Sequence, residues 1–333
     1  MGRLENTLTF IQDVKFSKYP NPIRNLNFFD MNFRYINWLS ILLSMPLFMV
    51  SQNNMTATEE IPGSKESYIL TDISYINDAV FMGRRDSIAA PYIFPSFGYY
   101  DRSGFFADVS ASYLIGSNEN RFDLFLTTLG YRSVKEKISG GVSGTAYFFN
   151  EDSYNVKSSV KGDIIGFLSY DLNLFEVTVM ASTYFNDGST TDFFAGFMLD
   201  HIFYGIDRNF LIDPSIGIYA GSQNFYEAYY STNRLGNRKG GSQRQGSSGP
   251  SSNTAATVEL REASKFTILN VELSIPLQYY HKQFVFSFTP VLALPQSSAT
   301  ITTEDTIITE DLESTFYFSA GISYWLNPKK NLQ

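Results

Sequence analysis

Apolar and polar residues alternate with a period of two along most of the chain after residue 90. In residues 269–279 every odd-numbered position is apolar, from Leu269 to Tyr279, and almost every even-numbered position is polar. Residues 316–326 show the same alternation, with the apolar residues at even positions. Successive side chains of a strand point to opposite faces. The pattern therefore predicts β-strands with one face in an apolar medium and the other in a polar one.

The length of these segments and the connections between them favour a membrane barrel. Alternation over ten or more residues matches the roughly 9–11 residues that a tilted strand needs to cross a bilayer, whereas strands of globular proteins have about 5–6. Short polar turns follow strand ends rich in Tyr, and the opposite connections are longer, which is the asymmetry of outer-membrane barrels. We predict an all-β fold, a transmembrane antiparallel up-and-down β-barrel. The alternative is an exported soluble β-sandwich, in which the alternation would serve a packed core.

The strand count follows from the direction of each segment. Six segments run toward the Tyr-rich ends, at 92–100, 122–131, 160–170, 193–204, 266–280 and 315–326, and five run the other way, at 105–115, 139–149, 174–185, 210–221 and 283–294. An even number with a periplasmic N-terminus requires one more strand, for which 68–82 is the only candidate. We predict about twelve strands within 68–326, with ten or fourteen as alternatives. Proline removes a ladder hydrogen bond, so bulges or breaks are expected at Pro95, Pro214, Pro276 and Pro290.

An export signal precedes the predicted barrel. Residues 38–50 form the longest apolar run, which is too short to span a bilayer and is typical of a secretory signal peptide. We expect residues 31–51 to be the signal peptide and residues 1–30 to be a mis-called extension; the alternative is an N-terminal membrane anchor. Residues 52–67 are expected to form a flexible periplasmic lead, and residues 327–333 a C-terminal tail.

Composition excludes several classes of function. The 333-residue chain has no Cys, 16% aromatic residues, 17% charged residues and a formal net charge of −8. The lack of Cys excludes disulfides, thiol catalysis and Cys-ligated zinc, and the acidic balance argues against a nucleic-acid partner. Asp200 and His201 are strand neighbours that point to opposite faces. We expect neither an enzyme nor a cofactor or metal site; an outer-membrane hydrolase is the least favoured alternative.

The last predicted strand resembles the C-terminal insertion signal of Gram-negative outer-membrane β-barrel proteins. Ser319, Gly321, Tyr324 and Leu326 fill the four positions of that signal, although seven further residues follow. Residues 83–114 are similar to uncharacterised, porin-like members of the same group. The resemblance implies a place in the outer membrane of a Gram-negative bacterium. It also implies the barrel-assembly machinery, outer-membrane lipid and lipopolysaccharide as partners.

The polar faces of the predicted strands supply candidate lumen residues. They are Asp108, Lys161, Asp163, Glu176, Asp213, Glu272 and Gln278. A mostly acidic lumen favours cations; the alternative is a lumen of ion pairs and water that conducts nothing. The aromatic strand ends predict a periplasmic girdle with rings in the apolar zone, formed by Tyr99, Tyr100, Tyr131, Tyr170, Tyr204, Tyr279, Tyr280 and Trp325.

Residues 222–263 contain a Gly/Ser-rich tract with an excess of basic residues. This composition predicts a mobile extracellular loop; contact with lipopolysaccharide and folding into the barrel mouth are the alternatives. The sequence favours a channel that passes small solutes or ions. The second candidate is a structural or surface-interaction barrel that acts through this loop. The oligomeric state cannot be read from these patterns.

Overall fold

The computed structural model describes residues 66–85, 90–116, 120–187, 190–205, 209–229, 259–260, 263–298, 300–302, 307–309 and 312–326. The predicted signal peptide, the extension before it, most of the periplasmic lead, the middle of the 222–263 loop and the C-terminal tail lie outside the described residues. No helix among the described residues is long and apolar enough to cross a membrane.

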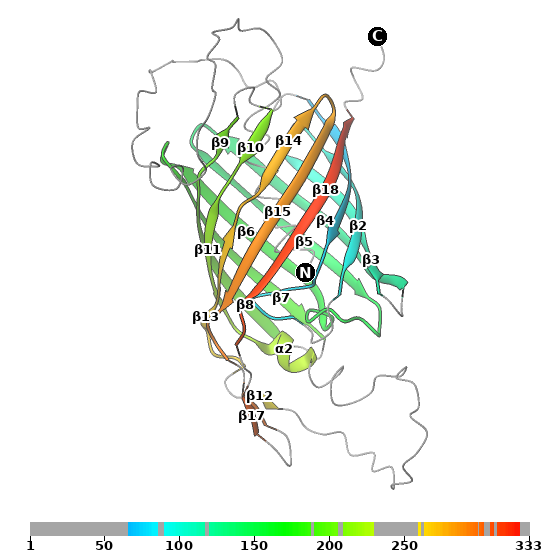
Figure 1. Cartoon of the computed structure of the whole chain (residues 1–333), viewed down its shortest axis with the longest axis vertical. Coiled ribbons are helices and arrows are strands. Elements are labelled where there is room, and N and C mark those ends of the chain that lie inside the picture. Colours follow the sequence, from blue (N-terminus) through cyan, green and yellow to red (C-terminus); the bar gives the residue numbers. More distant parts are fainter. Residues whose placement is uncertain are drawn as a thin grey trace, which may run out of the picture.

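The described strands form a closed antiparallel barrel (Figure 1). Its wall contains β1 (Tyr68–Ile76), β2 (Tyr92–Tyr100), β3 (Phe105–Ile115), β4 (Asn120–Lys135), β5 (Ile138–Phe149), β6 (Val160–Asp171), β7 (Glu176–Asn186), β8 (Thr191–Asp200), β9 (Phe203–Tyr204), β10 (Phe210–Ile212), β11 (Ser215–Gly221), β13 (Thr267–Ser274), β14 (Leu277–His281), β15 (Phe284–Pro295) and β18 (Thr315–Leu326). Each wall strand pairs with its neighbours along the chain, and β18 closes the ring on β1.

Three of the wall strands are broken into consecutive pieces, so the fifteen segments make twelve strands. The pieces are β8 with β9, β10 with β11, and β13 with β14. Two of these breaks fall at Pro214 and Pro276, where proline cannot donate to the ladder. The neighbouring strands remain joined there, because the Asp213 N–H donates to the Pro276 carbonyl at 2.9 Å. The structure confirms the predicted fold class and strand number.

The first strand is shorter than the predicted segment 68–82. β1 ends at Ile76, and the residues after it leave the wall and turn into the barrel, where Phe81 and Met82 are buried. A short hairpin causes the turn: the Phe81 and Arg84 backbones exchange two hydrogen bonds around Met82 and Gly83, both at positive φ. Ala79 to Met82 are therefore buried inside the barrel, while Asn77 still bonds to Phe318 of β18. The predicted strand was wrong for residues 77–82.

The two ends of the barrel differ in their connections. The turns at the end that carries both Tyr68 and Leu326 are short, such as 136–137 and 282–283. The connections at the other end include 77–91, 150–159 and 222–266, and carry a helix, α2 (Asn224–Tyr229), and a separate sheet of β12 (Glu259–Leu260), β16 (Thr300–Thr302) and β17 (Ile307–Thr309) (Figure 1). By the usual asymmetry of such barrels, we assign the short-turn end, uppermost in Figure 1, to the periplasm and the other end to the cell exterior.

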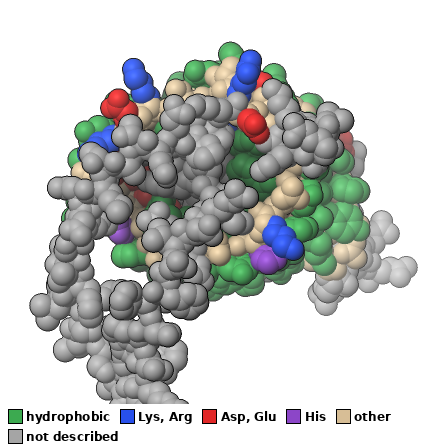
Figure 2. All heavy atoms as spheres, turned by 90° about the horizontal axis from the view of Figure 1, so that it is seen from above, with side chains coloured by type: hydrophobic (Ala, Val, Ile, Leu, Met, Phe, Trp, Pro, Cys, Tyr) green, Lys and Arg blue, Asp and Glu red, His purple; other side chains and the backbone are tan. Residues whose placement is uncertain are grey.

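The outer wall is apolar and uncovered. Leu129, Phe105 and Phe316 are 69%, 64% and 61% exposed, and Figure 2 shows hydrophobic side chains around the barrel. A soluble sandwich would bury this face in its core. Here it surrounds the barrel from outside, which fits immersion in lipid and no other medium.

Candidate functional site: the lumen and its extracellular closure

Carboxylates line the inner wall. Asp163, Asp213 and Glu272 are buried within the barrel, at 2%, 3% and 4% exposure, and Asp108 and Gln278 lie on the same inner face by the alternation of their strands. Glu176 also points inward, and its direct cross-strand neighbour is the buried Asp200. Asp72 of β1 belongs to this face as well and accepts a hydrogen bond from Ser323 of β18 at 2.7 Å. The inner wall is therefore strongly acidic.

Lys161 departs from the predicted lumen set. A register shift between Val160 and Gly162 places Lys161 in a β-bulge, where an extra residue takes a strand out of its alternation. Its side chain is 61% exposed and forms a salt bridge with Asp187 at 3.1 Å. Lys161 therefore does not share the buried inner face of Asp163 that strict alternation predicts.

The predicted girdle divides between the two faces of the wall. The outward members are between 39% and 47% exposed and lie at the lipid boundary: Tyr99, Tyr131, Tyr170, Tyr204 and Tyr279. Tyr100, Tyr280 and Trp325 occupy the alternate positions and point into the barrel. Tyr100 is buried, and the Tyr280 hydroxyl donates to Gln278 at 2.8 Å. Where two aromatic residues are adjacent at a strand end, only one of them can face lipid.

The inward aromatic residues of the periplasmic end stack on one another across the closing seam of the barrel. The Tyr68 ring lies 4.5 Å from the Trp325 ring and 4.9 Å from the Tyr100 ring, and Tyr100 in turn stacks on Phe106 at 5.6 Å. The Arg132 guanidinium lies over the Tyr100 ring at 4.9 Å and donates to the Tyr68 hydroxyl. This stack joins β18, β1, β2 and β3 on the inner side of the wall.

The insertion-signal residues lie on β18. Tyr324 faces outward against Phe284, with 4.9 Å between ring centroids. Gly321 is at a close approach: a Cβ there would lie 2.9 Å from Ser287 Oγ and 3.2 Å from Ser74 Cβ. Glycine thus lets β15, β18 and β1 meet at this point. Ser319 and Leu326 pair with Ile76 and Ile69 across the seam.

A periplasmic turn contains a carboxylate with a perturbed pKa. The Ser103 hydroxyl and backbone N–H both donate to Asp101 Oδ1, at 2.5 and 2.9 Å, and the Ser67 hydroxyl donates to Oδ2 at 2.9 Å. These hydrogen bonds favour the ionised form and hold the pKa of Asp101 well below its usual value. Asp101 thereby fixes the turn between β2 and β3.

Three segments of the extracellular connections fold into the barrel, and each is held by a carboxylate. The first, residues 77–85, is held at its base by Asp78, which accepts from the Ala79 and Ala90 N–H groups and from Arg85. Its hairpin tip is held by the buried Arg84, which donates to the Ser297 carbonyl at 2.7 Å and lies over the Tyr226 ring at 4.7 Å.

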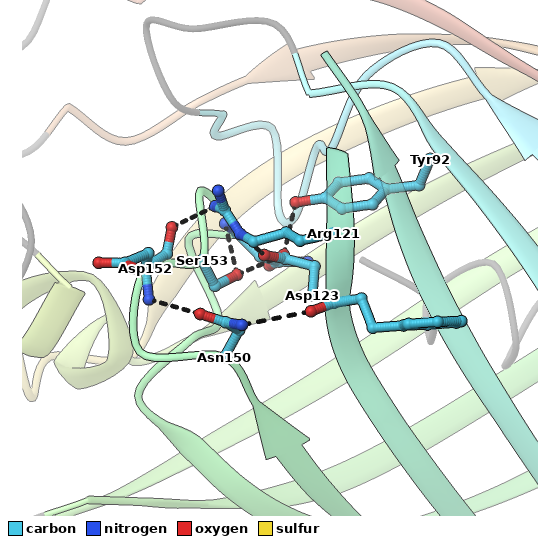
Figure 3. A network of polar contacts seen from close by, with 8 residues as sticks. Tyr92, Arg121, Asp123, Asn150, Asp152 and Ser153 are labelled. Carbon is cyan, nitrogen blue, oxygen red and sulfur yellow. Dashed lines mark hydrogen bonds and ion pairs between the residues drawn. The ribbon is translucent and has the colours of Figure 1, made fainter. Parts of the chain in front are cut away.

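The second inward segment, residues 150–159, is held by Asp123 of β4 (Figure 3). Asp123 Oδ2 accepts from the hydroxyls of Tyr92 and Ser153, at 2.7 and 2.6 Å, and Oδ1 accepts from Arg121 at 3.3 Å. Arg121 also donates to the Asp152 carbonyl. Asp123 is 1% exposed, so its carboxylate is shielded from water, whereas the bond from Arg121 to Asp152 is exposed. Together these contacts tie the segment to the wall.

The third inward segment is α2, which is held by Asp192 of β8. Asp192 accepts from the backbone N–H groups of Asn224 and Phe225, at 2.8 and 2.7 Å, and from the Ser222 hydroxyl at 2.6 Å. These are the unpaired N–H groups of the first helical turn, which an Asp side chain satisfies well. The helix presents Phe225, Tyr226 and Tyr229 to the interior.

The three segments meet in one aromatic cluster at the extracellular end. Phe81 of the first segment contacts Phe225 of the third, with 5.0 Å between ring centroids, and also Phe194 and Tyr184 of the wall. Lys157 of the second segment is completely buried beside Phe81. The buried side chains of the three segments thus fill the lumen at this end. Asp108 lies nearer the periplasmic end of β3 and Asp72 at the middle of β1, whereas Asp163 lies beside the cluster and accepts from the Tyr147 hydroxyl.

Comparisons with known proteins give a fold likeness and nothing closer. No family model and no curated protein sequence matches. Solved structures with a similar fold include the "KdgM porin" (8% identity, TM-score 0.41, 77% of this chain and 98% of that chain), the "NanC porin" (10%, 0.41, 77% and 98%) and "LpxR from Salmonella typhimurium" (11%, 0.40, 77% and 99%). These values are too low to transfer any functional residue to this chain.

A closed ring of twelve strands with an apolar outside and a polar inside decides the class of the protein. It is a transmembrane β-barrel of the outer-membrane type. Within the described part of this barrel, no three His, Asp or Glu side chains come close enough together to hold a metal ion. His201 packs against the ring of Phe203, with 4.4 Å between ring centroids.

The sequence pattern did not predict the carboxylates that hold the inward segments. Asp78, Asp123 and Asp192 stand near extracellular strand ends, a position that alternation alone does not distinguish from an ordinary loop. A signal for the first was present: alternation weakens after Ile76, and the apolar run 79–82 is followed by Gly83. An apolar run that ends in glycine beside the aqueous mouth of a barrel indicates a segment that turns inward.

Proposed function

We propose that this barrel is an outer-membrane channel for small solutes with a preference for cations, closed at its extracellular end by the three inward segments. The observation that carries the proposal is the charge of the inner wall. Asp72, Asp108, Glu176, Asp213 and Glu272 all point inward from the strands. These carboxylates outnumber the inward Arg121 and Arg132 of β4, and a narrow lumen with an excess of one charge sign concentrates ions of the opposite sign.

Two features of the lumen support passage rather than a filled core. Asp108, near the periplasmic end of β3, and Asp72, at the middle of β1, are only partly buried, whereas a barrel filled with side chains would bury such charges at a high cost. The closure is built from connections between strands and not from the wall, so it can move while the barrel stays intact. Gating by connections folded into a rigid barrel requires no change of strand register.

The experiment is conductance of the purified protein in planar bilayers under a KCl gradient. We expect infrequent openings in the wild type, and a reversal potential that shows preference for K⁺ over Cl⁻. The double variant Asp108→Asn, Glu272→Gln should lower this preference, whereas Asp187→Asn, which neutralises an exposed carboxylate outside the lumen, should leave it unchanged. The channel would be refuted if no openings were seen in the wild type or in variants whose inward segments are no longer held to the wall.

The second candidate is a barrel that displays the 222–263 loop for contact at the cell surface. The attachment of α2 to Asp192 favours it, because this contact fixes one base of the loop on the barrel rim. Deletion of residues 232–256 leaves α2 and β12 in place. Loss of surface binding with unchanged conductance would support this second function, and altered conductance with unchanged binding would support the channel.

A further inference from the structure

Lys157 is the most unusual charged residue of the described chain. It has no exposed surface, and its ammonium nitrogen lies 4.9 Å from the centroid of Phe81, 5.1 Å from that of Tyr147 and 5.9 Å from that of Tyr184. Three rings that surround one ammonium group form an aromatic cage, the arrangement that proteins use to bind alkylammonium ligands. We call these three rings the cage.

The backbone of the second inward segment delivers Lys157 to this position. Asn155 Oδ1 accepts from the Lys157 N–H at 2.9 Å, and the Val160 N–H donates to the Lys157 carbonyl at 2.8 Å. The result is a tight turn with Lys157 at its inner side. The cage itself does not depend on this segment: Tyr147 and Tyr184 belong to the wall strands β5 and β7, and Phe81 belongs to the first inward segment.

The cage is suited to a cation for two chemical reasons. The Tyr147 hydroxyl donates to Asp163 at 2.5 Å, and a phenol that donates to a carboxylate has a more electron-rich ring, which attracts a cation more strongly. An apolar residue of similar volume would fill the same space without the cost of removing an ammonium group from water. The site thus selects for positive charge rather than for bulk.

From this geometry we infer that the cage is a binding site for small organic ammonium solutes on the solute path, and that Lys157 occupies it as a tethered competitor. The inference rests on the proposed channel and names its substrate class. A free alkylammonium ion that enters the cage displaces Lys157, and the departure of Lys157 loosens residues 150–159 from the closure. Solute binding and opening are then coupled in both directions.

The first test uses the folded wild type and an amine-acylating reagent, with labelling of each lysine measured by mass spectrometry. Tetramethylammonium chloride is the probe, because it cannot be acylated, and NaCl at equal ionic strength is the reference. We expect labelling of Lys157 to rise at least about fivefold in tetramethylammonium, since displacement exposes it. Lys161, which is exposed in any case, is the internal control and should react equally in both salts. Equal labelling of Lys157 in the two salts overturns the proposal.

The second test empties the cage by mutation. Lys157→Ala keeps Cβ and therefore leaves a space with the shape of an n-propylammonium ion, and cavities made by truncation bind the missing group. We expect n-propylammonium chloride to reduce the conductance of this variant about tenfold at concentrations where 1-propanol has no effect. Adding Tyr184→Leu should abolish the response, and Lys161→Ala is the matched lysine control. Equal effects of propylammonium and propanol overturn the proposal.

The outcomes separate this inference from the proposed function. Exposure of Lys157 by tetramethylammonium in a protein that never conducts would refute the channel and retain the cage. Cation-selective conductance with no response of Lys157 would retain the channel and refute the cage. If Lys157→Ala does not fold, the labelling test on the wild type decides alone.

Discussion

Replacement of Asp123 by alanine should open the extracellular closure without unfolding the barrel. In the native protein the buried carboxylate of Asp123 accepts hydrogen bonds from Tyr92, Arg121 and Ser153. Of these partners only Ser153 belongs to the inward segment 150–159, and Arg121 adds a second link through the Asp152 carbonyl. The wall strands on either side keep their ladder, so the damage concentrates in the contact between segment and wall.

The size of the effect follows from the bonds that are lost. A hydrogen bond to a charged group contributes about 1.5–3 kcal/mol, and Asp123→Ala removes the Ser153 bond and the group that orients Arg121. A loss of about 2–3 kcal/mol in the docking of residues 150–159 raises the open population about 30- to 140-fold, at 1.4 kcal/mol per tenfold. Asp123→Asn retains an acceptor oxygen and should give a smaller rise, and Ser153→Ala a rise of about tenfold.

Native-state proteolysis of residues 150–159 in detergent micelles measures this population directly, because cleavage follows the open fraction when closing is fast. Bilayer conductance is the second readout, and retention of heat-modifiable gel migration shows that the barrel is intact. Cleavage and conductance of Asp123→Ala within about threefold of the wild type would refute the role of Asp123 in holding the closure.

Three further predictions concern other contacts. Asp192→Ala removes the acceptor of the α2 N-terminus and should lower the stability of this helix by about 2 kcal/mol. Amide exchange across Asn224–Tyr229 should become faster, while exchange in β4 stays unchanged. Exchange in α2 equal to that of the wild type would contradict the prediction. Trp325→Ala removes the seam stack on Tyr68 and should lower the stability of the barrel by about 2–3 kcal/mol. The measurement is the midpoint temperature of heat modification on gels, which should fall; an unchanged midpoint would show that the stack adds no stability. Hydrogen bonds lower the pKa of Asp101, so the stability that Asp101 gives to the β2–β3 turn is fully present above the ordinary Asp pKa of about 4. This stability is lost only as the pH falls through the lowered pKa. A carboxyl NMR titration with a midpoint near 4 would contradict this.

Much of the wall could be predicted from the sequence because lipid imposes one simple rule on every strand. Side chains at alternate positions must be apolar, as in residues 316–326, and the rule holds without knowledge of any other strand. Breaks at Pro214 and Pro276 follow from the missing N–H donor in the same local way. To predict these features, it is enough to know the residues of the strand itself.

The closure could not be predicted in this way because its residues obey no periodic rule. Asp123 acquires its role from Ser153, 30 residues away, and Asp192 from Asn224, 32 residues away. Lys157 likewise depends on the distant Phe81. Lys161 shows the same limit on a smaller scale, since one bulge is enough to turn it away from Asp163. Alternation also cannot tell which of two adjacent aromatic residues, such as Tyr99 and Tyr100, faces lipid.

The pairing of β1 with β18 has a consequence for the order of assembly. Ile69 lies opposite Leu326, so the contact that completes the ring joins the beginning of the barrel sequence to its very end. Contacts of such long sequence separation are the slowest to form. Until β18 is in place, β1 and β15 both expose strand edges, which are templates for pairing with other chains. Other copies of the chain must therefore be kept away from these edges until β18, the twelve-residue last strand, has paired. Loss of β18 should produce aggregates rather than a smaller barrel.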